Sequence, residues 1–145
     1  MSTPPESRDV ARIAVRRTSC GALLVSLLLG AIAGCATKPI YEVTDAPFPA
    51  STSAEDDQLA DLIREAGKRQ GWRIEKEAPG RMRGNYLRGR HRAVVEIEYS
   101  ASAYSITYRD SAFLKYDGDS IHDTYNVWVR DLEAAIDREA KFRLH

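Results

Sequence analysis

The stretch RMRGNYLRGRHRAVVEIEY (residues 81–99) decides the fold, because it contains two alternating strands joined by the two-residue loop Gly89-Arg90. A two-residue loop that begins with glycine favours a type II′ hairpin, and its length fixes which residues face each other. Counting outward pairs Tyr86 with Ala93, Gly84 with Val95 and Met82 with Ile97 on one face, and Arg83 with Glu96 and Arg81 with Glu98 on the other. Apolar residues meet apolar ones and opposite charges meet, so we predict an antiparallel hairpin with one apolar face.

Further strands flank this hairpin. A run from Trp72 to Glu77 precedes it, and after it Tyr104, Ile106 and Tyr108 alternate with polar residues, which is the pattern of a half-buried strand. We expect a last short extended piece at residues 114–116, ended by the turn pair Asp117-Gly118. The sequence therefore predicts about four antiparallel strands.

An amphipathic helix is expected on each side of the strands. The first begins near Ser53, which can cap it, and ends at Gly71, which can adopt the left-handed conformation. The second covers about residues 123–143, with Asp123 as the expected cap. An α+β fold, with the N-terminal and C-terminal helices packed on one face of the sheet and the other face in solvent, buries all of these apolar stripes.

Composition narrows the function classes. The 145 residues allow one small domain, and the equal numbers of basic and acidic residues, 21 each, give no overall field that would attract nucleic acid. Both cysteines, Cys20 and Cys35, precede the expected domain, so no disulfide is predicted within it.

The first 34 residues have the order of a secretory signal, with a basic stretch that ends at Arg16-Arg17 and then an apolar run from Gly21 to Ala33. The run ends in Ile32-Ala33-Gly34-Cys35, which resembles the lipobox of bacterial lipoprotein precursors. This resemblance implies cleavage between Gly34 and Cys35 and lipidation of Cys35. An uncleaved signal anchor remains an alternative, because no charged residue lies between Thr18 and Thr37.

Either reading places the domain outside the cytoplasm. Since Ala36 is not the Asp that retains many lipoproteins in the inner membrane, we expect an outer-membrane anchor facing the periplasm, with the inner membrane as the alternative. Residues 35–53 contain three prolines and no periodicity, which favours a lipidated N-terminus followed by a flexible tether with a reach of about 23 Å. The periplasmic domain is then expected at residues 54–145.

A second resemblance runs along most of residues 55–140. It is carried by Gly71-Trp72, Glu77-x-Pro79-Gly80, Tyr99-Ser100, Tyr104-Ser105-Ile106-x-Tyr108-x-Asp110-Ser111 and Ile121-His122-x-x-Tyr125-Asn126-x-Trp128. With these motifs the chain is similar to a family of small uncharacterised proteobacterial lipoproteins, which often have Pro where this chain has Asp123. The family has no established reaction, so the resemblance implies location and fold and transfers no catalytic residue.

A basic cluster marks the expected hairpin turn. Arg88, Arg90, His91 and Arg92 have no predicted partner, and they could bind the phosphates of an anionic glycolipid or an acidic envelope protein. The alternative is that they form an ordinary solvated strand face.

Other groupings give weaker indications of chemistry. The acidic and imidazole side chains Asp110, Asp117, Asp119, His122 and Asp123 are close in sequence, but their spacing matches no calcium loop. Ser105 or Ser111 with His122 has the composition of a hydrolytic triad without a nucleophile motif, and no metal or cofactor motif is present. The six tyrosines from Tyr86 to Tyr125 could form a glycan-stacking groove, although their spacing places most of them in the core.

The sequence therefore predicts a membrane-anchored envelope lipoprotein that acts as a non-enzymatic binding or structural accessory module. Its expected contacts are the membrane, through the lipid, and an envelope protein or anionic glycolipid. The alternative is a small hydrolase or ligand-binding enzyme that acts on cell-wall material, which would need a concave pocket with convergent polar groups.

Overall fold

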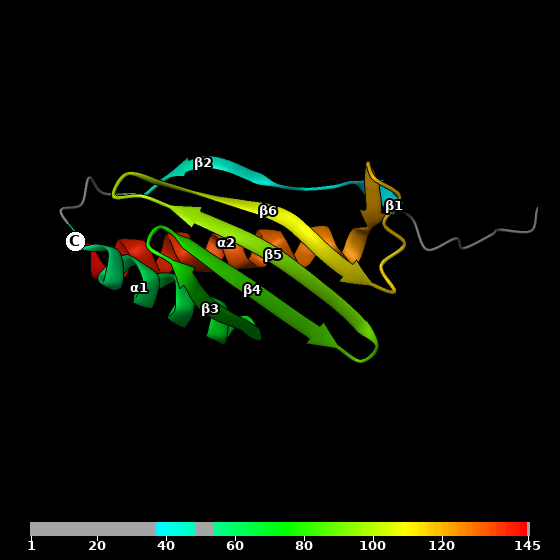
Figure 1. Cartoon of the computed structure of the whole chain (residues 1–145), viewed down its shortest axis with the longest axis horizontal. Helices are drawn as coiled ribbons and strands as arrows, with labels where there is room; N and C mark the ends of the chain where they lie inside the picture. The colour runs from blue at the N-terminus through cyan, green and yellow to red at the C-terminus, as the bar shows by residue number, and fades with distance from the viewer. Residues whose placement is uncertain (1–36, 49–53, 145) are drawn as a thin grey trace, which may run out of the picture. The chain divides into compact units, whose positions relative to one another are not determined.

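The chain has an α+β fold, as predicted, in which an antiparallel sheet packs against two helices (Figure 1). The computed structural model describes residues 37–48 and 54–144. In chain order the elements are β1 (Thr37–Pro39), β2 (Val43–Pro47), α1 (Asp56–Arg69), β3 (Trp72–Ala78), β4 (Arg81–Arg88), β5 (His91–Tyr99), β6 (Ala103–Ala112), β7 (Ser120–His122) and α2 (Asp123–Arg143). The leader, the cleavage site at Gly34 and Cys35, and the expected cap Ser53 lie outside the described residues.

The main sheet has five strands in the order β2-β6-β5-β4-β3, and β1 pairs with β7 in a separate two-stranded sheet. The expectation of about four strands is therefore corrected, since β2 adds an edge strand next to β6. Figure 1 shows α1 and α2 on the same face of the main sheet, as expected. The opposite face of the sheet carries no helix in the described part of the chain.

The hairpin predicted at residues 81–99 is confirmed in its register. Tyr86 pairs with Ala93, Gly84 with Val95, Met82 with Ile97, Arg83 with Glu96 and Arg81 with Glu98. Gly89 has a φ of +60° and Arg90 has a negative φ, which is the combination that a type II′ turn requires. The two-residue loop therefore does set the pairing of these strands.

The expectation of a flexible tether is wrong for residues 37–48. Val43 pairs with Ile106 and Pro47 with Ala103, while Thr37 pairs with His122. Pro39 and Pro47 each end a short strand that has only one neighbour, and a missing backbone N–H is tolerated at such positions. Prolines here mark edge strands rather than a linker.

Both helix starts use a different cap from the expected one. The N-cap of α1 is Glu55, whose backbone N–H donates to Gln58 Oε1 at 3.2 Å. The bounds of α2 are as predicted, but its N-cap is His122, whose Nδ1 accepts from the Thr124 N–H at 3.2 Å. Gly71, with a φ of +85°, ends the α1 region as expected.

Residues 114–116 do not form the expected strand. Instead β6 continues to Ala112, and the next strand is β7, whose His122 N–H donates to the Leu114 carbonyl at 2.8 Å. Phe113 and Lys115 have positive φ values of +60° and +51°, which are incompatible with an extended run. Leu114 between them is 1% exposed.

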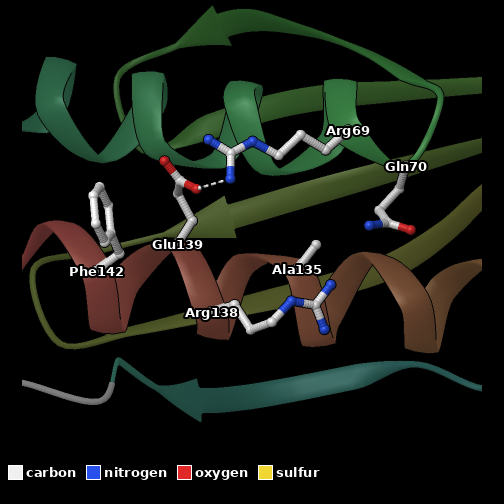
Figure 2. Close-up of a pocket in the computed structure, with 6 residues that line it drawn as sticks. All are labelled: Arg69, Gln70, Ala135, Arg138, Glu139 and Phe142. Atoms are coloured by element: carbon white, nitrogen blue, oxygen red, sulfur yellow. Dashed lines mark ion pairs between the residues drawn. The ribbon is translucent and has the colours of Figure 1, made fainter.

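The two helices pack against each other near the end of α2. Glu139 is 3% exposed, and its carboxylate pairs with Arg69 of α1 at 3.0 Å and with Arg143 at 2.6 Å. Figure 2 shows the Arg69 guanidinium reaching from α1 to Glu139 on α2. A buried carboxylate needs such partners, so this contact helps to fix the pairing of the helices.

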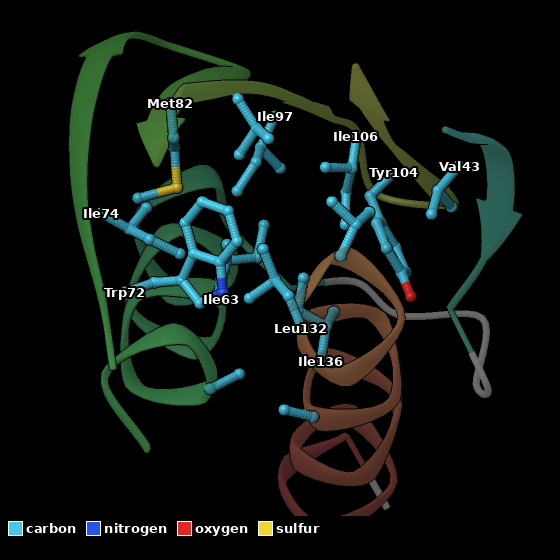
Figure 3. Close-up of a cluster of buried hydrophobic side chains, with 14 of the residues drawn as sticks. Val43, Ile63, Trp72, Ile74, Met82, Ile97, Tyr104, Ile106, Leu132 and Ile136 are labelled. Atoms are coloured by element: carbon cyan, nitrogen blue, oxygen red, sulfur yellow. The ribbon is translucent and has the colours of Figure 1, made fainter. Parts of the chain in front are cut away.

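The core fills the space between the sheet and the helices. Figure 3 shows side chains from the strands, among them Ile74, Met82, Ile97 and Ile106, pointing toward Ile63 of α1 and Leu132 and Ile136 of α2. Tyr99, Tyr104 and Tyr125 are buried, which confirms the core interpretation for these three aromatic residues. Tyr86 lies between Trp72 and Trp128, with ring centroids 5.1 and 4.4 Å away.

A polar stripe on α2, formed by Asn126, Arg130, Glu133 and Asp137, contacts the N-terminal segment and β6. The Asn126 side chain is 1% exposed; its Oδ1 accepts from the Tyr41 N–H at 2.8 Å and its Nδ2 donates to the Pro39 carbonyl at 2.9 Å. The Tyr41 hydroxyl donates to Glu133 at 2.7 Å and its ring lies 4.3 Å from the Arg130 guanidinium. The stripe therefore fastens residues 39–41 to a helix about 85 residues later.

The fourth residue of the stripe, Asp137, forms a hydrogen bond with a residue of β6. Tyr104, 1% exposed, donates its hydroxyl to Asp137 Oδ1 at 2.7 Å. Burial first, and then this hydrogen bond, raise the pKa of the Tyr104 phenol well above its ordinary value of 10.0.

We expect Asn126→Ala to lower the free energy of unfolding by about 2 kcal/mol, because two hydrogen bonds are lost and the Tyr41 N–H and Pro39 carbonyl lose their partner. Urea denaturation measures the loss, and hydrogen exchange should show faster exchange at the Tyr41 amide. Asn85→Ala is the matched control, since the half-buried Asn85 side chain makes no hydrogen bond within the described part of the chain. Equal losses in both variants would contradict the role of Asn126.

Alkaline stability provides a second test of the stripe. Because the folded pKa of Tyr104 exceeds the unfolded value of about 10, the unfolded state ionises first, and the stability from this group is lost as the pH rises above 10. Tyr104→Phe should cost about 1 kcal/mol at neutral pH and make the fall in stability above pH 10 shallower. Denaturation curves between pH 8 and 12 measure this, and an unchanged slope would argue against the assignment.

Candidate binding surface

The turn between β4 and β5 forms an exposed end of the domain, which we call the hairpin tip and define as Leu87, Arg88, Gly89 and Arg90. Leu87 is 70% exposed, and Phe113, at the end of β6, is 60% exposed. The Arg90 guanidinium lies 4.4 Å from the centre of the Phe113 ring, a distance typical of a cation–π contact. Arg90 of the hairpin tip is therefore in contact with an exposed aromatic ring, and Leu87 is a second exposed apolar side chain on the same turn.

The structure divides the four basic residues predicted from sequence into two pairs. Within the described ranges neither Arg88 nor Arg90 makes a side-chain hydrogen bond or ion pair, and the Arg90 guanidinium lies over the Phe113 ring. Arg92 instead pairs with Asp110 across the strands at 2.6 Å, and the His91 ring packs 6.1 Å from that of His122. Arg88 and Arg90 thus retain their charge for an external ligand, whereas Arg92 is neutralised.

The uncovered face of the sheet carries a network of opposite charges. Arg83 forms an ion pair with Glu77, and Arg109 pairs with Glu77 at 2.9 Å and with Glu96 at 3.5 Å. The predicted opposition of Arg83 and Glu96 is correct as strand register, but the ion pair of Arg83 goes to β3 instead. A shallow hollow of about 190 Å³ on this face is lined by Arg83, Asn85, Arg92, Val94, Arg109 and Asp110.

The acidic and imidazole residues that were close in sequence each serve a local purpose. Asp117 Oδ1 accepts the backbone N–H groups of Asp119 and Ser120, at 3.1 and 2.8 Å, and these bonds lower the pKa of Asp117. Asp123 pairs with Lys38 at 2.9 Å, and His122 caps α2. Within the part of the chain that the structure describes, no group of three or more His, Cys, Asp or Glu side chains is placed to hold a metal ion.

The two candidate serines are also separated from His122. Ser105 Oγ accepts the Asp45 N–H at 3.0 Å, and Ser111 Oγ lies 3.0 Å from the Tyr108 hydroxyl. Neither serine is hydrogen-bonded to His122 among residues 37–48 and 54–144. The structure does not bring together the triad that the composition allowed.

A groove of about 300 Å³ lies between the ends of the two helices (Figure 2). It is lined by Arg69, Gln70, Ala135, Arg138, Glu139 and Phe142. Its buried carboxylate, Glu139, is already paired with two arginines, which leaves an apolar wall with the 83% exposed Phe142 at one edge. The sequence reasoning missed this groove, because it depends on how the two helices meet.

Sequence reasoning also missed the apolar part of the surface at the hairpin tip. Leu87 stands at an outward position of β4, in alternation with Met82, Gly84 and Tyr86, which all face the core. An apolar residue at an outward position was therefore a usable signal. Phe113 gave no such signal, since its exposure results from the positive φ at this residue.

Comparison of the chain with protein-family models, curated protein sequences and solved structures finds no significant match. Over the described ranges, none of the helices is both long enough and apolar enough to span a bilayer.

We expect His122→Ala to destabilise the domain by about 1 kcal/mol, because the Thr124 N–H at the start of α2 loses its acceptor. His122→Asn should retain most of the stability, since Asn is a preferred N-cap residue. Thermal denaturation of both variants beside the unchanged protein measures the difference. If Asn were as damaging as Ala, capping would not be the main contribution of His122.

Proposed function

We propose that this chain is a bacterial envelope lipoprotein, cleaved between Gly34 and Cys35, acylated on Cys35 and held at the outer membrane on its periplasmic side. The signal-like order of residues 1–34 and the lipobox-like Ile32-Ala33-Gly34-Cys35 support this proposal. The resemblance of residues 55–140 to small proteobacterial lipoproteins favours the same location. Several acyl chains on one cysteine would anchor it far more firmly than a single chain.

The domain is proposed to act as a binding or structural accessory module rather than as an enzyme. The observation that carries this proposal is that the candidate reactive side chains already have partners within the described part of the chain. Asp110 pairs with Arg92, Asp117 holds a turn and His122 caps a helix. Groups used in this way are poorly placed to transfer protons to a substrate.

The hairpin tip is the proposed binding surface, with an anionic component of the envelope as its ligand. Arg88 and Arg90 supply charge that no carboxylate in the described part of the chain neutralises. Guanidinium groups suit phosphate-bearing ligands, because they donate several hydrogen bonds in a planar arrangement.

The anchor is tested by mass spectrometry of the native protein extracted from membranes. We expect a chain that begins at Cys35 and carries a diacylglycerol on its sulfur and an acyl group on its amine. Cys35→Ser should prevent both changes and leave the leader attached, whereas Cys20→Ser is the matched control and should be processed normally. An unmodified Cys35 in the native protein, or a retained leader, would overturn the proposal.

A further inference from the structure

The hairpin tip lies at the end of the domain from which the anchor would extend. Only Ala36 separates Cys35 from β1, so a lipid on Cys35 would be joined to the domain through a single intervening residue. Thr37 pairs with His122, and the His122 ring packs against that of His91, the residue that follows the hairpin tip. Figure 1 shows β1, β7 and the β4–β5 turn at the same end of the domain.

The attachment of the N-terminal segment restricts how far the domain can move from its anchor. The Asn126 side chain and the pairing of β1 with β7 hold residues 37–41 on the domain. An acylated Cys35 would therefore be connected to a fixed point rather than to a tether of 18 residues. This end of the domain would stay at the bilayer surface, at a high effective concentration relative to it.

The surface at this end has the chemistry of a membrane contact. Leu87 and Phe113 are 70% and 60% exposed, Arg90 lies over the Phe113 ring, and Arg88 follows Leu87 in the same turn. Apolar side chains next to long cationic ones are typical of segments that rest in the headgroup region, where the apolar part enters the lipid and the charge meets phosphate. Lys115 adds a third exposed cation near Phe113 in sequence.

Carboxylates near this surface must be considered, and the closest in strand register, Asp110, is already paired with Arg92. Asp117 and Asp119 are exposed in the connection before β7, where Asp117 binds backbone N–H groups. The Asp119 carbonyl accepts the Ile40 N–H at 3.0 Å, so the backbone of this connection lies beside the segment that follows β1. Attraction to an anionic surface would therefore come from Arg88 and Arg90 of the hairpin tip.

We infer that the hairpin tip and Phe113 insert into the anionic phospholipid leaflet that holds the acyl chains of Cys35, and thereby fix the orientation of the domain on its own membrane. This inference rests on the proposed lipidation of Cys35. It names the anionic component that the hairpin tip binds as phospholipid headgroups, rather than a glycolipid or an acidic protein.

The test uses the mature acylated protein reconstituted into vesicles of phosphatidylcholine with phosphatidylglycerol. An environment-sensitive fluorophore is attached at Leu87→Cys, and quenching by nitroxide-labelled lipids is measured. Acylation blocks the sulfur of Cys35, so the label reacts with the introduced cysteine alone. Ala101→Cys is the matched control, because this exposed turn lies at the other end of β5, about 26 Å away.

We expect lipid quenching and a blue shift at residue 87 and neither at residue 101. Replacing both Arg88 and Arg90 by Gln should weaken insertion of the hairpin tip roughly 25-fold, at about fivefold for each cation. The unchanged hairpin tip should insert similarly weakly into vesicles of phosphatidylcholine alone, which carry no net negative charge. The substituted residues lie on an exposed turn, so the variants should retain the fold, and circular dichroism would verify this.

A label at residue 87 that stays as water-exposed as the one at residue 101, on protein that remains bound to the vesicles, would overturn this inference and leave the lipoprotein proposal intact. Quenching that appears only after a glycolipid or an acidic protein is added would likewise overturn it in favour of that ligand. Native protein that carries no acyl chain would overturn the proposed function first, and this inference with it.

Discussion

The structure depends on one buried amide, that of Asn126, which satisfies a backbone donor and a backbone acceptor on opposite sides of Ile40. The segment that it holds, residues 39–41, runs from the last residue of β1 into the connection to β2, and these two short strands belong to different sheets. The backbone N–H and C=O groups of such a segment need hydrogen-bond partners. The Asn126 side-chain amide provides one acceptor and one donor, as a neighbouring strand would. This contact adds to the three pairs of residues in each strand pairing and to the ion pair of Lys38 with Asp123, and among the polar contacts of the described residues 37–48 it is the one made by a buried side chain of α2.

The same helix face extends this attachment toward the sheet. Asn126, Arg130, Glu133 and Asp137 follow helical spacing, so they form a line beside the apolar stripe of α2. Tyr41, between β1 and β2, and Tyr104, on β6, reach this line from positions far apart in sequence, and each donates its hydroxyl to a carboxylate. The aromatic rings bury apolar area while their hydroxyls remain paired, which lets one edge of the core be polar without unsatisfied groups.

Local patterns were sufficient to predict the hairpin and the second helix. The register of β4 and β5 follows from a two-residue loop, and the bounds of α2 follow from its apolar spacing. The cap of α2 could not be chosen in the same way, because His122 and Asp123 are adjacent and both can accept a backbone hydrogen bond. The structure selects His122, and Asp123 then pairs with Lys38 of β1, a residue 85 positions earlier.

The first two strands were missed for a related reason. Val43 pairs with a residue about 60 positions later and Thr37 with one about 85 positions later. Neither strand is long enough to show alternation, and β2 contains a shift in register at Asp45, whose φ is +47°. Short edge strands that contain prolines have the composition of a linker, so only their distant partners distinguish them.

The sequence predicted Arg88, Arg90, His91 and Arg92 as one basic cluster. The position of β6 decides that Arg92 is paired with a carboxylate within the domain. Arg92 lies one residue before Ala93 on β5, and Asp110 is brought near it by a shift in the β5–β6 register between Val94 and Val95. The extra residue in β6, Arg109, joins the ion pairs of the open face. A bulge of this kind changes which side chains oppose each other, and no count of alternating residues reveals it.

Burial of Leu114 explains why the exposed surface includes Phe113. The two residues that flank Leu114 have left-handed backbone conformations, which cost roughly 1 to 2 kcal/mol each for residues other than glycine. In return, Leu114 enters the core and its carbonyl binds the His122 N–H, which connects the end of β6 to the start of α2. With Leu114 turned inward, Phe113 is turned outward, where the Arg90 guanidinium covers its ring. The exposed aromatic residue is therefore a consequence of how the core is closed at this end, and the adjacent arginine is what makes that end both apolar and positively charged.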